Sequence, residues 1–233
     1  RARTSPVPTD VVFGVNPVLA ALTAQRRSLT TLYVQASLEP AARKDAAALE
    51  RAVSMARACG LNVVTADKGE LNNMARNRPH QGLVLAAGSL PDLPVDRLPA
   101  PPAQGPSPVW LALDEIQDPQ NLGALLRSAH FLGASGVLVS ARNSAPLSGA
   151  TSKASAGAAE LMPVHTTGNL VRTLSRARED GWRVVGAGRG APERTVRAAD
   201  LRADAPTVLV LGNEGKGLRA LVKRECDCLA FID

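Results

Sequence analysis

The chain has 233 residues and a formal net charge of +6 at pH 7; hydrophobic residues make up 45% of it and aromatic residues only 3%. No apolar run approaches the roughly 20 residues of a membrane-spanning helix, so the sequence predicts a protein without a membrane partner. A core this poor in aromatic side chains must consist of Ala, Val and Leu, which is typical of α/β proteins with buried strands.

The positive charge is concentrated in the first part of the chain. Residues 1–88 hold 11 Lys and Arg against 6 Asp and Glu, whereas residues 109–233 hold 15 against 13. A basic N-terminal part favours an anionic partner, most simply nucleic acid. An ordinary arginine-rich surface explains it equally well, because few aromatic side chains are available to stack on bases.

The three cysteines predict neither a metal site nor a disulfide framework. No CxxC pair and no His-rich tract accompanies them, so we expect no metal and a reducing compartment. Residues 1–10 read as a disordered segment. Arg1 and Arg3, followed by Thr4 and Ser5, also fit the end of an organellar transit peptide.

Residues 11–88 read as one α/β domain. Asn16 is the predicted N-cap of its first helix, with Pro17 at the first helical position and Arg26-Arg27 at the end. Gly60 is expected to end the second helix. The remaining elements are predicted as strands 29–35, 61–65 and 82–87 and helices 40–59 and 68–76.

Residues 89–108 contain seven prolines, which predicts an extended linker to a second domain, 109–233. That domain alternates strands with helices, as in a parallel sheet covered by helices. Its strands are predicted at 109–113, 136–140, 161–164, 182–186, 207–211 and 229–232, and its helices at 121–132, 148–156, 170–180 and 217–224.

The stretch 113–133 is the first candidate site. A strand ends in an acidic loop that turns at Asp118-Pro119 into a helix carrying Asn121 near its start and Arg127 about two turns in. Open α/β sheets place ligands beyond such strand ends. The alternative is an ordinary strand–loop–helix corner in which Asn121 is a capping residue.

The stretch 208–218, VLVLGNEGKGL, is the second candidate site. A short apolar strand runs into a loop with three glycines, which let the backbone approach a ligand closely, and Glu214 adds a carboxylate suited to a ribose or amino group. It is not a phosphate-binding Walker A loop, because Val210 stands where the first glycine belongs and Gly217 where Ser or Thr belongs. A plain glycine-rich turn is the alternative.

Two further stretches are weaker candidates. Residues 142–160 are rich in Ser, Ala and Gly, which permits close backbone packing, and Lys153 is a lone cation there that suits a phosphate. A solvated lysine is the equal alternative. His80-Gln81-Gly82 precedes the last strand of the first domain and reads as a turn or an RNA contact.

The two candidate stretches resemble the first two motifs of the SpoU (TrmH-like) RNA 2′-O-ribose methyltransferases of the SPOUT superfamily. The first motif is carried by Asp118-Pro119-x-Asn121-x-Gly123-Ala124-x-x-Arg127-Ser128-Ala129, and the second by Leu211-Gly212-Asn213-Glu214-Gly215-x-Gly217-Leu218. Phe13-Gly14 and His80-Gln81-Gly82 resemble the L30e-like RNA-binding domain of the ribosomal-RNA branch. Residues 142–158 are most similar to the mitochondrial rRNA methyltransferase 1 group.

This resemblance implies the roles of the site residues. Arg127, Asn121 and Glu214 would be catalytic, with Arg127 binding the substrate phosphate and placing the ribose 2′-oxygen, because an arginine is normally always protonated. S-adenosyl-L-methionine would be the cofactor, and no metal would be needed. The residues implied to hold the cofactor are Leu211, Gly212, Asn213, Gly215, Gly217 and Ile232. Those implied to hold RNA are Arg26, Arg27, His80, Gln81 and Lys153.

The family's third motif, which follows the last strand, is absent from the chain as printed. In the family that segment forms a trefoil knot and completes the cofactor pocket, so the resemblance implies an incomplete knot and a truncated methyltransferase domain, or an inactive product. The expected activity is 2′-O-methylation of a guanosine in large-subunit rRNA by a mitochondrial homodimer, with a chloroplast or bacterial cytoplasm as the alternative location. The alternative functions are a non-catalytic RNA-binding protein and a tRNA 2′-O-methyltransferase.

Overall fold

The computed structural model describes residues 10–36, 46–202 and 204–232, so the predicted disordered or targeting segment 1–10 lies almost wholly outside the described residues. The chain forms two compact units. The first unit comprises residues 1–91, 122–127 and 146–161, and the second comprises residues 92–121, 128–145 and 162–233.

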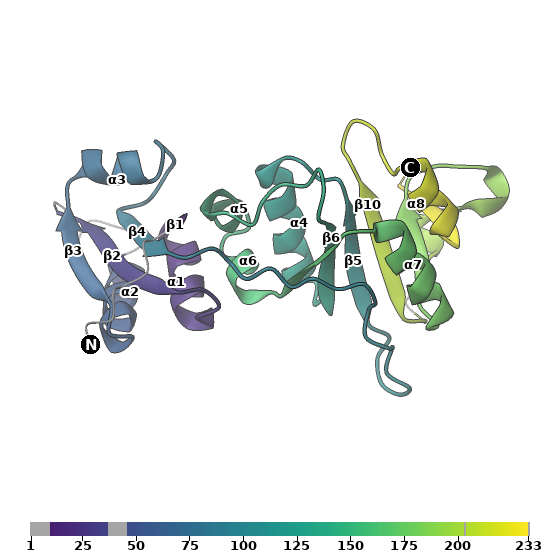
Figure 1. The fold of residues 1–233 in the computed structure, drawn as a ribbon, viewed down its shortest axis with the longest axis horizontal. Helices are drawn as coiled ribbons and strands as arrows, with labels where there is room; N and C mark the ends of the chain where they lie inside the picture. Colours follow the sequence, from purple (N-terminus) through teal and green to yellow (C-terminus); the bar gives the residue numbers. More distant parts are fainter. Residues whose placement is uncertain (1–9, 37–45, 203, 233) are drawn as a thin grey trace. The chain divides into compact units, whose positions relative to one another are not determined.

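The first unit is built on a four-stranded sheet in the order β1-β4-β2-β3 (Figure 1). β4 runs antiparallel to both of its neighbours, whereas β2 and β3 are parallel. The strands are β1 (Asp10–Phe13), β2 (Leu29–Gln35), β3 (Asn62–Ala66) and β4 (Leu83–Ala87). The helices between them are α1 (Val15–Ala24), α2 (Ala46–Ala58) and α3 (Lys68–Met74).

Helices cover both faces of this sheet. Leu83, Leu85 and Ala87 of β4 pack with α1 and α2, whereas Val84 packs with α3. Successive side chains of a strand point to opposite faces, so one all-apolar strand supplies both cores.

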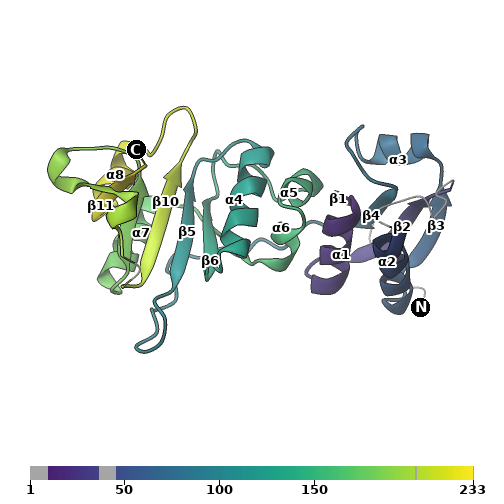
Figure 2. The ribbon, with the colours of Figure 1, turned by 180° about the vertical axis from the view of Figure 1, so that it is seen from behind.

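The second unit is built on a seven-stranded sheet in the order β7-β6-β5-β10-β8-β11-β9, in which every described pair is parallel. Figure 2 shows β10, β5 and β6 side by side in it. Its strands are β5 (Val109–Asp114), β6 (Gly136–Ser140), β7 (Val164–Thr167), β8 (Arg183–Ala187), β9 (Thr195–Arg197), β10 (Thr207–Gly212) and β11 (Cys228–Phe231). The remaining helices of the chain are α4 (Pro119–Phe131), α5 (Gly149–Ala154), α6 (Ala158–Leu161), α7 (Leu170–Glu179) and α8 (Ala220–Glu225). The predicted α/β class is confirmed.

The strand order positions the site. From β5 the chain moves outward through β6 to β7, and β10 returns later to pair with the other side of β5. The order of the strands therefore reverses between β5 and β10, and such a switch point leaves a crevice at the carboxyl ends of the strands. One face of this sheet is covered by α7 and α8, whose Leu174 and Val222 lie in the same apolar core as Val208 and Val210 of β10.

Several predicted elements begin or end elsewhere. The N-cap of α1 is Gly14, with φ +92°, and not Asn16, which is the second residue of the helix. The predicted helix 148–156 is shorter in the structure, where α5 spans Gly149–Ala154, and a second short helix, α6, follows it at Ala158–Leu161. Ala156 and Gly157, which separate the two helices, both have left-handed backbones.

In the second half of the chain, two more predictions are wrong in their bounds and one strand was not predicted. The predicted strand 161–164 is displaced to β7, because Leu161 still belongs to α6. α8 begins only at Ala220, since the preceding glycine loop stays non-helical. The short strand β9, flanked by 3-10 turns Pro192–Arg194 and Ala198–Asp200, was not predicted. The start of the predicted helix 40–59 lies outside the described residues.

Small residues allow close backbone packing inside the first unit, as predicted for the Ser/Ala/Gly-rich stretch. A Cβ atom added at Gly149 would lie under 3.0 Å from the carbonyl oxygen of Val11, and one at Gly123 would lie under 3.0 Å from Ala154. Side chains at either position would force backbone shifts, which typically destabilise a core by about 1–3 kcal/mol.

Candidate functional site

The two candidate stretches meet at the carboxyl edge of the second unit's sheet. β5 and β10 are in register to their ends, with Leu113 opposite Leu211 and Asp114 opposite Gly212. The loops that follow are joined directly, because the Asn213 side chain donates from Nδ2 to the backbone oxygen of Glu115 over 3.1 Å.

Two of the predicted catalytic residues are hydrogen-bonded to each other. Asn121 Nδ2 donates to Glu214 Oε1 over 2.7 Å. Asn121 lies in the first turn of α4, whose N-cap is Asp118 with Pro119 at the start, so the capping alternative for Asn121 is wrong. Its side chain is thereby available to reach across to the second loop.

A buried carboxylate fixes the end of the second loop. Asp114 is fully buried and accepts from Arg219 at two atoms, from the backbone N–H over 3.0 Å and from Nε over 2.7 Å. A buried charge is costly unless it is paired in this way. Arg219 was not predicted as a site residue, although a carboxylate at the end of an all-apolar strand indicates that a cationic partner is needed.

Glu115 is held in a left-handed backbone, φ +58°, by neighbouring loops. Its N–H donates to Ser140 Oγ over 3.0 Å, and its carboxylate accepts from Asn143 Nδ2 over 3.2 Å. It also pairs with Arg219 at 3.3 Å. Non-glycine residues rarely adopt this conformation, and such strain gathers at functional sites.

The second loop presents backbone rather than side chains. Asn213 Oδ1 accepts from the N–H groups of Gly215 and Lys216 over 3.0 and 3.2 Å, and the Gly217 N–H donates to the Asn213 carbonyl over 2.7 Å. A Cβ atom at Gly212 would lie under 3.0 Å from backbone atoms of Gly217, so only glycine permits this fold-back.

This loop fits a nucleoside-type cofactor bound through its backbone. Residues 214–217 are exposed, and the position of a Cβ at Gly217 has nothing within 4 Å. Open glycine backbone at a switch point suits the close approach of such a group. Of the other residues predicted to hold the cofactor, Leu211 ends β10 beside the loop. Ile232 follows β11, which β8 separates from β10, and it is 87% exposed.

Arg127 is exposed on α4, and its guanidinium makes no hydrogen bond or ion pair with any residue that the structure describes. The Asn121 amide makes its described hydrogen bond with Glu214 and not with Arg127. Arg127 is thus a cation available to a ligand.

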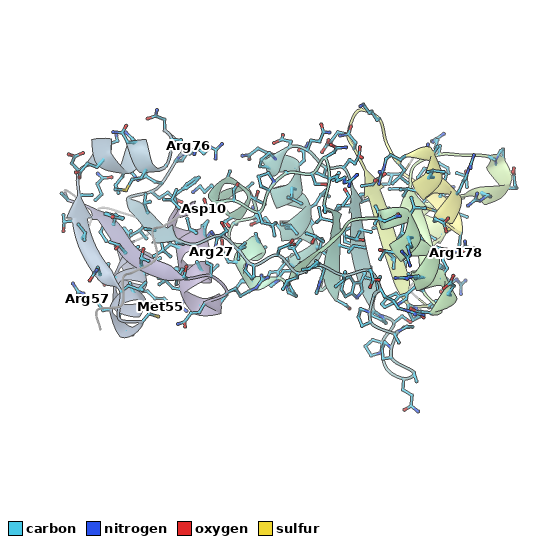
Figure 3. The ribbon with its side chains drawn as sticks, viewed as in Figure 1. Asp10, Arg27, Met55, Arg57, Arg76 and Arg178 are labelled. Carbon is cyan, nitrogen blue, oxygen red and sulfur yellow. The ribbon has the colours of Figure 1, made fainter. Side chains whose placement is uncertain are left out.

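Arg27, predicted to contact RNA, is instead a buried structural residue of the first unit, so this prediction is wrong. Its guanidinium has no exposed surface and pairs with Asp10 at 2.9 Å and with Glu160 at 2.8 Å, and Figure 3 labels Asp10 and Arg27 close together. Glu160 also accepts from Ser152 Oγ. The neighbouring Arg26 donates to the backbone oxygens of Ala159 and Glu160 over 3.2 and 3.3 Å.

The Glu160 carboxyl is expected to make stability depend on pH. Burial raises the pKa of Glu160 above its ordinary 4.5, while Arg27 opposes the shift. The folded state therefore holds a proton more tightly than the unfolded chain, and this contribution to stability is full below pH 4.5 and lost as the pH rises through the raised pKa. Glu160→Gln should remove that part of the slope, measured by urea unfolding between about pH 4 and 8.

The exposed Glu50 on α2 provides the control for this prediction. Glu50→Gln makes the same chemical change at the surface of the same unit, and its slope is the reference for that of Glu160→Gln. An unaltered slope in the Glu160→Gln variant would contradict the assignment of this slope to the buried carboxyl.

The other predicted RNA contacts lie together in the first unit. Lys153 Nζ donates to Gln81 Oε1 over 2.6 Å, and burial lowers the pKa of Lys153. His80 is buried in the turn before β4, in which Gln81 has a φ of +53°. The stretch is therefore a turn, and the RNA contact at it stays a prediction.

No group of three or more His, Cys, Asp or Glu able to hold a metal ion occurs among the described residues. All three cysteines are free thiols, and burial raises the pKa of Cys226 to about 12. Among the residues with described positions, no helix is both long and apolar enough to cross a bilayer.

Similar proteins support the resemblance found in the sequence. Human "rRNA methyltransferase 1, mitochondrial" is 39% identical over 239 residues, covering 97% of this chain and 66% of that protein. An "Uncharacterized tRNA/rRNA methyltransferase" of Mycobacterium avium is 37% identical and covers 96% of this chain and 70% of its own. The chain thus spans about two thirds of the length of these relatives.

Solved structures share the fold. The AdoMet-bound rRNA methyltransferase of Sinorhizobium meliloti superposes with a TM-score of 0.73 at 24% identity, over 96% of this chain and 78% of that one. The SpoU methyltransferase AviRb of Streptomyces viridochromogenes, in complex with AdoMet, superposes with a TM-score of 0.67 at 23% identity, over 95% and 80% of the two chains.

Two protein families match the chain in sequence, and together they cover nearly all of it. Residues 11–92 match the family described as RNA 2'-O ribose methyltransferase substrate binding. Residues 108–233 match the SpoU rRNA Methylase family. With these matches and with relatives close to 40% identical, the resemblance is confirmed. The chain belongs to the SpoU rRNA methylase family.

Proposed function

We propose that this chain transfers a methyl group from S-adenosyl-L-methionine to the ribose 2′-oxygen of a guanosine in large-subunit rRNA. The observation that carries the proposal is the hydrogen bond between Asn121 and Glu214, which joins the two motif loops at the switch point of a parallel sheet. The solved relatives that bind AdoMet support the cofactor, and the human relative's name supports an rRNA substrate.

The glycine loop would hold the cofactor through the backbone of residues 211–217. When bound, the cofactor supplies an electrophilic methyl group on a sulfonium. Arg127 would bind a substrate phosphate and so place the 2′-oxygen for attack, because its guanidinium is exposed and makes no contact within the described residues. Accurate positioning by itself supplies a large part of such a barrier.

Asn121 and Glu214 would hold the ribose. Their hydrogen bond leaves Glu214 with a second carboxylate oxygen, which can accept from a ribose hydroxyl. The hydrogen bonds between Asp114, at the end of β5, and Arg219 would hold the end of the loop that carries Glu214. No residue of this arrangement has to act as a metal ligand.

The domain boundaries and the assembly are part of the same proposal. Residues 11–88 would form an L30e-like RNA-binding domain, residues 89–108 a linker, and residues 109–233 the methyltransferase domain. A homodimer is proposed as the active assembly and the mitochondrion as the location, the latter supported by the name of the human relative.

Isothermal titration with S-adenosyl-L-methionine and transfer of a radiolabelled methyl group test the proposal. We expect cofactor binding and labelling of large-subunit rRNA at one guanosine, located by ribose-methylation mapping. Labelling of tRNA alone would mean that the substrate is tRNA and not large-subunit rRNA. RNA binding without cofactor binding would mean that the chain is a non-catalytic RNA-binding protein and not an enzyme.

A further inference from the structure

An open pocket of about 310 Å³ lies in the first unit, beside α3. It is formed by the end of β2, by α3 and by the turn that leads into β4. The polar residues used below line it: Gln35, Lys68, Asn72, Asn77, Arg78 and His80. Its volume is at the lower end of the range for small-ligand sites, which suits a group the size of a single nucleotide.

His80 forms a preorganised wall of the pocket. It is only 6% exposed, and the Gly82 N–H donates to its Nδ1 over 3.0 Å. The proton therefore lies on Nε2, which donates to Asn72 Oδ1 over 3.1 Å. This bond fixes the orientation of the Asn72 amide. Its nitrogen remains a donor that makes no hydrogen bond with any described residue.

Four further polar side chains of the pocket are uncommitted, whereas the Gln81 side chain, which also lines it, accepts from Lys153 Nζ. Within the described residues, the side chains of Gln35, Lys68, Asn77 and Arg78 make no hydrogen bond or ion pair. Asn77 has a left-handed backbone, φ +57°, held by its N–H donating to the Asn72 carbonyl over 2.7 Å. The pocket thus gathers fixed amide groups and two cations with unused hydrogen-bonding capacity.

The charge of the pocket is one-sided. Lys68 and Arg78 carry positive charge, and no Asp or Glu is among the described residues that line it. The two carboxylates of α3 are used at its N-terminus, where the Glu70 N–H donates to Asp67 and the Asp67 N–H donates to Glu70. An anionic ligand therefore meets no opposing carboxylate at the pocket wall.

We propose that this pocket receives one unpaired nucleotide of the RNA substrate. Lys68 and Arg78 bind its phosphate, and the amides of Asn72 and Asn77 hydrogen-bond the edge of its base. The Arg78 guanidinium supplies a flat surface for stacking, as arginine does in single-stranded RNA readers. The inference rests on the proposed function only in taking RNA as the substrate.

An acidic peptide is the other ligand that two cations attract. The amide donors and acceptors favour RNA, because a base edge offers both donors and acceptors to amides, whereas a carboxylate offers acceptors only. The pocket is also close to nucleotide size, whereas a charged peptide needs an extended groove.

Fluorescence anisotropy tests this inference with two labelled hairpin RNAs, one carrying a single unpaired nucleotide and one fully paired. We expect Arg78→Ala and Lys68→Ala each to weaken binding of the first hairpin about tenfold, the usual effect of losing a stacking or phosphate contact. The fully paired hairpin should lose about twofold or less, since it cannot fill the pocket.

Arg57→Ala is the matched control. Arg57 is an exposed cation of the same unit on α2, which covers the opposite sheet face from α3, and Figure 3 shows it far from Arg76 at the end of α3. It should leave both affinities within about twofold. Arg78→Lys should restore phosphate binding in part but not stacking, because only arginine has a planar group.

Three outcomes would overturn the inference. Equal losses for both hairpins would mean that the two cations act only as general surface charge, and an unchanged affinity would mean that the pocket takes no RNA. Binding of a labelled decaglutamate peptide that Arg78→Ala abolishes, with RNA binding unaffected, would assign the pocket to an acidic peptide. A protein that transfers no methyl group but still distinguishes the two hairpins as expected would contradict the proposed function and support the inference.

Discussion

Replacing Arg127 by alanine is expected to lower kcat for methyl transfer by about a hundredfold or more. The guanidinium is exposed and makes no contact with any described residue, so its removal should leave the free energy of unfolding unchanged. Loss of the phosphate contact would leave the 2′-oxygen poorly placed for attack. Single-turnover kinetics with saturating cofactor measures this effect separately from product release.

Two further variants test whether the decrease in kcat comes from the Arg127 guanidinium itself. Arg127→Lys keeps the charge but not the two-pronged geometry, so it should recover only part of the rate. Arg224→Ala is the matched control, because Arg224 is an exposed arginine on α8 that likewise makes no described contact. A fully active Arg127→Ala protein would exclude Arg127 from catalysis.

Replacing Gly212 by alanine is expected to weaken S-adenosyl-L-methionine binding by roughly tenfold to a hundredfold. The added Cβ would lie under 3.0 Å from backbone atoms of Gly217 and Leu218, so the loop must open. Overpacking of this kind costs about 1–3 kcal/mol. Each 1.4 kcal/mol by which it destabilises the loop conformation that binds the cofactor raises Kd about tenfold. Calorimetric titration measures the change.

Gly168→Ala is the control for this loop. A Cβ atom at Gly168, also in the second unit, would meet nothing within 4 Å. Thermal unfolding should show a decrease of roughly 2–4 °C in Tm per kcal/mol for Gly212→Ala and no decrease for the control. If Gly212→Ala binds the cofactor with unchanged Kd, the closed loop is not the cofactor site.

The two motif loops illustrate how much of the site the sequence predicts. Pro119 marks the start of a helix, and this signal is local, so α4 was predicted to within two residues at its start and one at its end, although Asp118 and not Asn121 is the cap. The glycine loop after β10 was likewise visible as an apolar run followed by glycines. What the sequence does not contain is the neighbour of each strand, and only the pairing of β5 with β10 brings Asn121 to Glu214.

The predicted RNA contacts illustrate the opposite case. Arg26-Arg27 reads as a basic surface pair, yet burial against Asp10 and Glu160 turns Arg27 into an internal ion pair. Residues 17 and 133 positions away in the chain determine that outcome, and no local pattern encodes them. The pocket beside α3 was similarly missed, since its lining comes from three separate segments.

The sequence by itself determined the α/β class, the two motifs and the family, because hydrophobic periodicity, turn residues and motif spacing are local properties of the chain. Only the tertiary structure decided which charges are buried, that Arg219 donates hydrogen bonds to Asp114, and that Glu115 adopts a left-handed backbone. These features depend on long-range strand order and desolvation, which arise when distant segments pack together.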